Sequence, residues 1–103
     1  MNATMILNRA EELREELIEN RRTLHSYAET GFDLPQTTAF VEKKLREYGL
    51  TPVRCGKAGI TCVIGDPQKG KCFLLRGDMD ALPMTEESGL PFAAQNGHCH
   101  SCG

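Results

Sequence analysis

The feature that most constrains the fold is a change of hydrophobic period halfway along the chain. In residues 4–28 apolar side chains recur at spacings of three, four or seven, which is the period of an amphipathic helix. These side chains are Ile6, Ala10, Leu13, Leu17, Leu24 and Ala28. A second apolar stripe predicts a helix over 35–48, with Pro35 suited to its first turn and Gly49 to its C-terminal stop. After Pro52 the helical period gives way to short apolar runs.

These short runs are rich in β-formers and predict strands. The expected strands are 51–55, 60–64 and 71–77. Gly65 to Gly70 reads as a turn, so we expect a β-hairpin around Asp66-Pro67, with Cys62 and Cys72 as small buried hydrophobes. Two helices followed by strands predict an α/β fold in which the helices cover one face of a sheet.

Length and charge limit the classes of function. A chain of 103 residues is at most one small domain, and its net charge of −2 leaves no basic surplus for neutralising phosphates, so nucleic acid is not expected as a partner. No apolar run approaches the roughly 20 residues that cross a bilayer, and the start of the chain turns acidic too early for a signal peptide. We therefore expect a cytoplasmic protein without membrane contact. Its odd number of cysteines argues against a disulfide framework.

Chemically active residues gather after residue 77. Asp78 and Asp80 follow an apolar run, and if a strand continues through them their side chains point to the same side. Two carboxylates placed in this way can bind a cation, orient a histidine or transfer a proton. The alternative is a hydrated turn in which the aspartates cap backbone N–H groups.

A second dense segment closes the chain, with two imidazoles and two thiols among residues 98–102. Both groups ligate zinc and other transition metals. Side chains this close cannot all reach one ion without strain, so we expect one or two ligands for a site that is completed from elsewhere. The alternative is a tail whose Cys and His residues have no metal role.

Three blocks carry a resemblance to a known family: RRTLHSYAETGFDLPQTTAFVEKKLREYGL, LLRGDMDALPMTEESGLPF and GHCHSCG. Together they resemble the start of the two-metal aminoacylase and carboxypeptidase family, which includes hippurate hydrolases and indole-acetyl-amino-acid hydrolases. The resemblance extends from Arg21 over nearly the whole chain. It implies that residues 1–103 are the truncated N-terminal portion of a zinc-peptidase-like α/β sandwich catalytic domain. The smaller dimerisation domain of the family, and with it a homodimer, would belong to the full-length form.

The resemblance also implies roles for four residues. The family segment reads H-A-C-G-H-D, so Cys102 corresponds to a metal ligand and the next ligand would follow Gly103. Asp80 corresponds to a catalytic aspartate that orients a metal-bound histidine or shapes the field of the metal. Asp78 and His100 correspond to positions beside the site and are expected to support it without ligating. The remaining ligands and the glutamate general base would lie downstream.

The implied function is metal-dependent hydrolysis of amide bonds in N-acyl amino acids or small peptides. The cofactors would be two divalent ions, zinc, manganese, cobalt or nickel, and the chain alone is expected to be inactive because its site is incomplete. One alternative is a small metal-binding module that uses His98, Cys99, His100 and Cys102. Another is a truncated product without a function.

Overall fold

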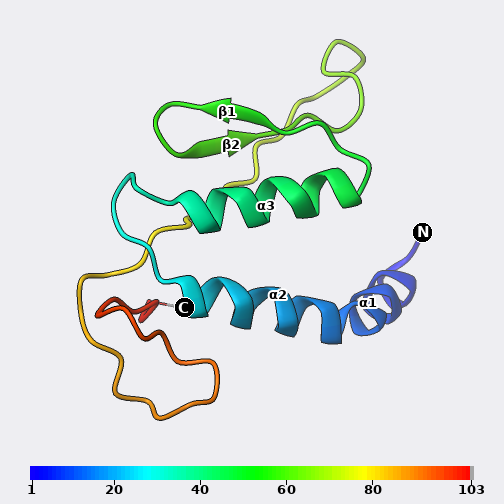
Figure 1. Cartoon of the computed structure of the whole chain (residues 1–103). Coiled ribbons are helices and arrows are strands. Elements are labelled where there is room, and N and C mark those ends of the chain that lie inside the picture. Colours follow the sequence, from blue (N-terminus) through cyan, green and yellow to red (C-terminus); the bar gives the residue numbers. More distant parts are fainter. Residues whose placement is uncertain (103) are drawn as a thin grey trace.

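The computed structural model describes residues 1–102 and contains three helices followed by one pair of strands. The helices are α1 (Ala3–Glu12), α2 (Arg14–Tyr27) and α3 (Pro35–Glu47), and the strands are β1 (Val53–Cys55) and β2 (Gly59–Thr61). Helix α3 contacts both α2 and β2, so it lies between the long N-terminal helix and the strand pair (Figure 1). The expected α/β content, with helices first, is confirmed.

The single helix expected over 4–28 is instead two helices separated at Leu13. The Leu13 N–H is shared between the carbonyl groups of Arg9 and Ala10, at 3.3 and 3.2 Å, as is common where a helix ends. Helix α1 buries none of its residues, so no packing holds it in line with α2. One distorted residue hardly shifts the apolar period, and for this reason the pattern could not locate the break.

The helix expected over 35–48 is confirmed as α3, and its N-terminus is closed by a residue from outside the helix. Leu34 at the N-cap position has no side-chain acceptor. Glu29 takes that role, because its carboxylate accepts the N–H of Gln36 at 3.1 Å and of Thr37 at 2.7 Å. These two hydrogen bonds link the segment after α2 to the start of α3.

The strands pair in a different way from the expected sheet. Strands β1 and β2 form a tight antiparallel hairpin in which Val53 pairs with Thr61 and Cys55 with Gly59. A Cβ at Gly59 would lie 2.6 Å from the Cys55 carbonyl oxygen, so this turn requires glycine. The hairpin predicted around Asp66-Pro67 is wrong: residues 66–69 form a turn, with the Lys69 N–H 3.1 Å from the Asp66 carbonyl, but no strands flank it.

The strand predicted over 71–77 is also wrong, since those residues are extended without a partner. Phe73, Leu74 and Leu75 are 83%, 89% and 96% exposed. Cys72 is exposed and Cys62 half-buried, so neither is a core residue. An apolar run of this type forms a strand only when neighbouring strands supply hydrogen bonds and cover, and the described residues supply neither.

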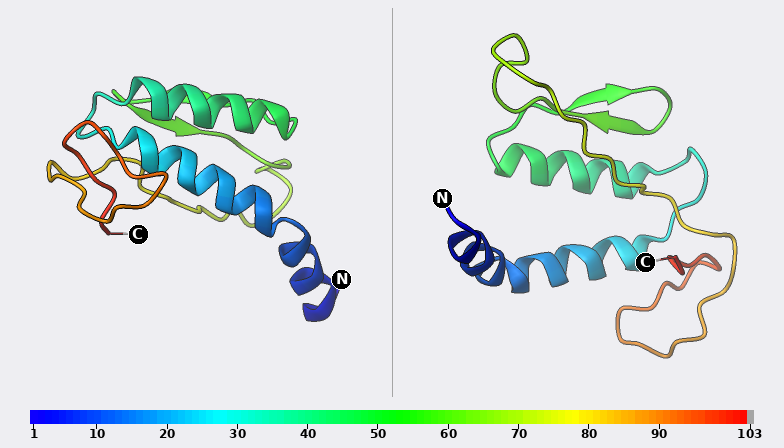
Figure 2. Two further views of the ribbon diagram at one scale, coloured as in Figure 1. Left: turned by 60° about the horizontal axis from the view of Figure 1, so that its bottom comes forward. Right: turned by 180° about the vertical axis from the view of Figure 1, so that it is seen from behind.

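The buried centre is small and lies where the C-terminal segment meets the end of α2. It consists of Ala28, Ala81 and Ala94. The Ala81 N–H donates to the Glu29 carbonyl at 2.7 Å, and Leu82 pairs with Cys99 in an isolated antiparallel bridge. All three views show the segment after residue 80 folded against this end of α2 (Figures 1 and 2). Within residues 1–102, no helix has the length and apolar character needed to cross a membrane.

Candidate functional site

A cluster of three metal-ligating side chains lies at the C-terminal end of α2. His25, in the last turn of α2, places its Nε2 atom 2.7 Å from Oε1 of Glu86. The Cys99 sulfur lies 3.8 Å from the same oxygen, and the three donor atoms all lie within 4.8 Å of one another. The cluster is buried: the His25 and Glu86 side chains are 9% and 4% exposed. The structure therefore holds a His/Glu/Cys group that could bind a metal ion.

Glu86 is the centre of this cluster and carries a negative charge. Its carboxylate accepts the Ser88 hydroxyl, the Ala94 N–H at 3.0 Å and the His25 imidazole. The Ser88 hydroxyl bond is the largest of the effects that lower the pKa of Glu86 to about 2, and the Ala94 N–H and His25 add to it against burial. Because an ionised carboxylate only accepts hydrogen bonds, the Nε2 atom of His25 carries the proton.

Cys99 lies in the same environment, but its pKa rises where that of Glu86 falls. Burial, and then the neighbouring charge of Glu86, raise the pKa of the Cys99 thiol above its ordinary value. The thiol is therefore protonated at neutral pH in the metal-free chain. A cation would have to displace that proton in order to bind the sulfur.

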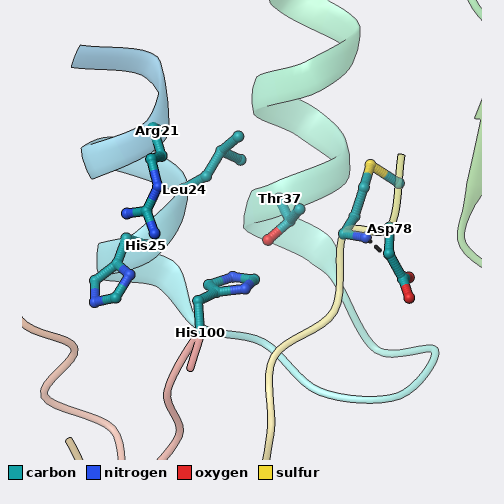
Figure 3. A pocket seen from close by; sticks show the side chains of 7 residues that line it. Arg21, Leu24, His25, Thr37, Asp78 and His100 are labelled. Carbon is teal, nitrogen blue, oxygen red and sulfur yellow. Dashed lines mark hydrogen bonds between the residues drawn. The ribbon is translucent and has the colours of Figure 1, made fainter. Parts of the chain in front are cut away.

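A small cavity of about 150 Å³ adjoins the cluster. Its lining residues are Arg21, Leu24, His25, Thr37, Asp78, Met79 and His100 (Figure 3). The His25 and His100 rings lie side by side, with centroids 6.1 Å apart. Among residues 1–102, neither His25 Nδ1 nor His100 Nε2 has a hydrogen-bond partner, although both atoms are buried. The cavity is thus walled by two imidazoles with unused nitrogen atoms.

Burial is the main reason why the pKa of His100 falls below its ordinary value. The neighbouring His25 and Arg21 side chains act in the same direction, and Asp80 opposes them. His100 is therefore neutral at physiological pH and offers a lone pair.

Two of the four residues predicted from the sequence meet in this cavity. Asp78 and His100 both line it, although Asp78 is exposed, caps the Met79 N–H at 3.1 Å and lies 3.8 Å from Arg76. Asp78 and Asp80 also line a larger hollow beside the hairpin. The strand expected to align the two aspartates does not form, so the loop places them there. Cys102 is exposed and lies outside the His25–Glu86–Cys99 cluster. The family resemblance also implies that Cys102 and Asp80 approach each other near the open end of the sheet, and this stays a prediction.

The sequence predicted no role for His25 and Glu86, the two members of the cluster that lie outside the thiol-rich tail. His25 and Glu86 are 61 residues apart, and no local pattern predicts such a pairing. One signal was present: Cys99 and Cys102 stand at the C-x-x-C spacing of many metal and redox sites. The structure gives these two thiols different environments, one buried against Glu86 and one exposed.

Comparison with known proteins finds relatives for almost the whole chain, while no family model matches it. The chain is 40% identical over 94 residues to the N-acetyl-L-cysteine deacetylase of Bacillus subtilis, covering 88% of this chain and 22% of that enzyme. It is 36% identical over 95 residues to the N-acyl-L-amino acid amidohydrolase of Geobacillus stearothermophilus, covering 90% of this chain and 26% of that enzyme.

A third relative bears a name from another class of enzyme. It is a protein of Rhodococcus jostii named as a glutamate–cysteine ligase, 42% identical over 104 residues, which are 98% of this chain and 13% of the relative. The match leaves most of that protein uncovered, so its name says little about the matched part. The chain spans about a quarter or less of the length of each of these relatives.

Proposed function

This chain matches a segment of the amidohydrolase family whose members are named as enzymes that act on N-acyl amino acids, and on this premise we propose that it is the N-terminal portion of a metal-dependent amidohydrolase catalytic domain. The observation that carries the proposal is the 34–40% identity, over most of the chain, to proteins named as deacetylases and amidohydrolases. The proposed substrates are N-acyl amino acids or small peptides, and the proposed compartment is the cytoplasm. The sandwich architecture, and a homodimer formed through a separate domain, belong to the same proposal.

The donor chemistry of the C-terminal segment supports a metal in this function. Cys102 supplies an accessible thiol, and His100 supplies a buried imidazole nitrogen without a partner in the described part of the chain. Thiolate and imidazole are ligands that zinc, cobalt and nickel accept well, while manganese favours oxygen ligands such as carboxylates. We propose that Cys102 ligates one of two divalent ions and that Asp80 and Asp78 support the site from its edge. Bound ions would lower the pKa of a water molecule and polarise the amide carbonyl.

Within this proposal the residues that line the cavity orient the substrate and tune the pKa of the His100 imidazole. The charge of Asp80 opposes the fall in the pKa of the His100 imidazole. Arg21 lines the same cavity and offers a guanidinium that can pair with a carboxylate group of a substrate. The chain provides one proposed metal ligand, so residues 1–103 alone are expected to be inactive.

The test is an activity assay on N-acetyl amino acids with zinc, manganese, cobalt or nickel. We expect a protein that contains this chain and has the full length of its relatives to be active, and residues 1–103 alone to be inactive. Cys102→Ala should reduce metal content and turnover together, whereas Asp80→Ala should lower activity or metal affinity by about 10- to 100-fold and turnover more than metal content. A Cys102→Ala enzyme that kept both its metals and its rate would contradict the ligand assignment.

The second candidate function is a small metal-binding module, and the His25–Glu86–Cys99 cluster favours it because it needs no residue beyond residue 102. It differs from the module expected from His98, Cys99, His100 and Cys102 in two of three ligands. Stoichiometric metal binding by residues 1–103, without hydrolysis, would support it.

A further inference from the structure

We propose that His25, Glu86 and Cys99 form a mononuclear site for a divalent transition-metal ion, separate from the metal pair proposed at Cys102. The inference goes beyond the proposed amidohydrolase function, which places no metal at these three residues, and it deepens the second candidate function, on which it rests. It rests on the position of the three side chains and on the hydrogen bonds that hold them.

Two of the three distances between the donor atoms are close to those that tetrahedral coordination requires, and all three donor atoms lie within 4.8 Å of one another. With metal–N and metal–O bonds of about 2.0–2.1 Å and a metal–S bond of about 2.3 Å, tetrahedral donors stand roughly 3.3–3.6 Å apart. Here His25 Nε2 and Glu86 Oε1 are 2.7 Å apart, and Glu86 Oε1 and the Cys99 sulfur are 3.8 Å apart. Shifts below about 1 Å, within reach of side-chain rotation, would bring these pairs to ligand spacing.

The protons on His25 and Cys99 can both be accounted for when a divalent ion binds. The proton on His25 Nε2 moves to Nδ1, which leaves Nε2 free to bind the ion. The Cys99 thiol releases its proton to solvent and binds as a thiolate, so one proton is released per ion. Glu86 binds through the oxygen that faces His25. The donor set is then a neutral imidazole, a carboxylate and a thiolate, which suits zinc or cobalt, with a fourth position left for water.

Hydrogen bonds and ring packing around the cluster already hold its side chains in place. The Ala94 N–H and the Ser88 hydroxyl bond to the Glu86 carboxylate and can keep doing so on its other lone pairs. The edge-on Phe92 ring lies 5.7 Å from the His25 ring and limits solvent on that side. Cys99 is fixed by its backbone pairing with Leu82, at 3.0 and 2.9 Å. The ligands are thus held by an α-helix, a short bridge and a hydrogen-bonded loop.

Cobalt(II) titration of residues 1–103 tests this site, because a thiolate bound to cobalt gives a charge-transfer absorption band. We expect one ion per chain, a tetrahedral cobalt spectrum, and a shift of the His25 Nε2 resonance in nitrogen NMR when zinc replaces cobalt. Cys99→Ser, which barely changes side-chain volume, should abolish the band and weaken zinc binding by at least about 10-fold. Cys55→Ser, at an exposed thiol outside both proposed sites, is the matched control and should leave both unchanged.

The two proposed sites fail in different ways in this experiment. A band that survives Cys99→Ser but disappears in Cys102→Ser would place the ion at the tail and overturn the inference while supporting the amidohydrolase site. Absence of one-to-one binding in a folded chain, with helical content checked by circular dichroism, would also overturn it. Neither result bears on whether a family-length protein hydrolyses N-acyl amino acids.

Discussion

At the scale of single residues, two buried carboxylates organise the region around the end of α2. Glu29 closes the start of α3, and Glu86 holds together His25, Ser88 and the loop that carries Cys99. Glu86 and Cys99 belong to the segment after residue 77 in which the sequence shows many chemically active residues, but the sequence could not show these pairings. Helix-capping rules look for an acceptor next to the helix, and Leu34 occupies that position here.

Glu29 gives the first prediction, which concerns the stability of the cap. Burial raises the pKa of Glu29, but the N–H groups of Thr37 and Gln36 outweigh burial and the pKa lies below its ordinary value. Glu29→Ala should lower the free energy of unfolding by about 1 kcal/mol, the usual effect of losing a cap. Asp33→Ala, a change at an exposed neighbour, is the control in urea denaturation. Equal stability of the two variants would show that the carboxylate does not cap α3.

Glu86 gives a prediction about the stability of the chain at low pH. A carboxyl group whose pKa is lower in the folded chain stabilises that chain fully above its unfolded pKa and loses the effect as the pH falls through the folded pKa. For Glu86 this window runs from the ordinary value of 4.5 down to about 2. The urea midpoint of the metal-free chain should therefore fall with pH across this window. Glu86→Gln should be less stable at pH 7 and show a flatter pH dependence. A parallel profile for both proteins would refute the role of the charge.

At the scale of elements, the helical period predicted α3 well because that helix packs against both α2 and β2. The same period could not show that residues 4–28 are two helices, since Leu13 interrupts the hydrogen bonds and not the spacing of apolar residues. The hairpin was misplaced for a related reason. Both Gly56–Ala58 and Gly65–Gly70 contain turn residues, and the pairing partner decides which of them becomes a hairpin.

Helix α1 gives the prediction at this scale. None of its residues is buried, and its Asn2 cap and its Arg9–Glu12 ion pair at 2.8 Å lie within the helix itself. Removing residues 1–12 should therefore change the free energy of unfolding by less than about 1 kcal/mol, because exposed ion pairs contribute little. Urea unfolding followed by circular dichroism measures this change. A large loss of stability would mean that α1 packs on the rest of the molecule more tightly than its exposure indicates.

At the scale of the whole molecule, the described chain buries small side chains and exposes large ones. Its apolar core residues are mostly alanines, whereas Ile64, Phe73, Leu74 and Leu75 are each at least 79% exposed. The strand predicted over 71–77 is wrong, because none of the described residues pairs with this segment or covers its apolar side chains. Pattern alone reports what a segment needs and not which partner supplies it.

The exposed run Phe73–Leu75 leads to the last prediction, which concerns association. An extended apolar segment with unpaired backbone groups is a template for pairing with another chain. The isolated chain should therefore self-associate as its concentration rises, as measured by sedimentation velocity. Leu74→Lys should suppress this association and change the free energy of unfolding by no more than about 0.5 kcal/mol, since Leu74 is 89% exposed. The matched control is Leu34→Lys, which places a charge at a residue only 5% exposed and should destabilise the fold instead. If wild type and Leu74→Lys associate to the same extent, the contact lies elsewhere on the molecule, and the segment is not the surface that a further strand would cover.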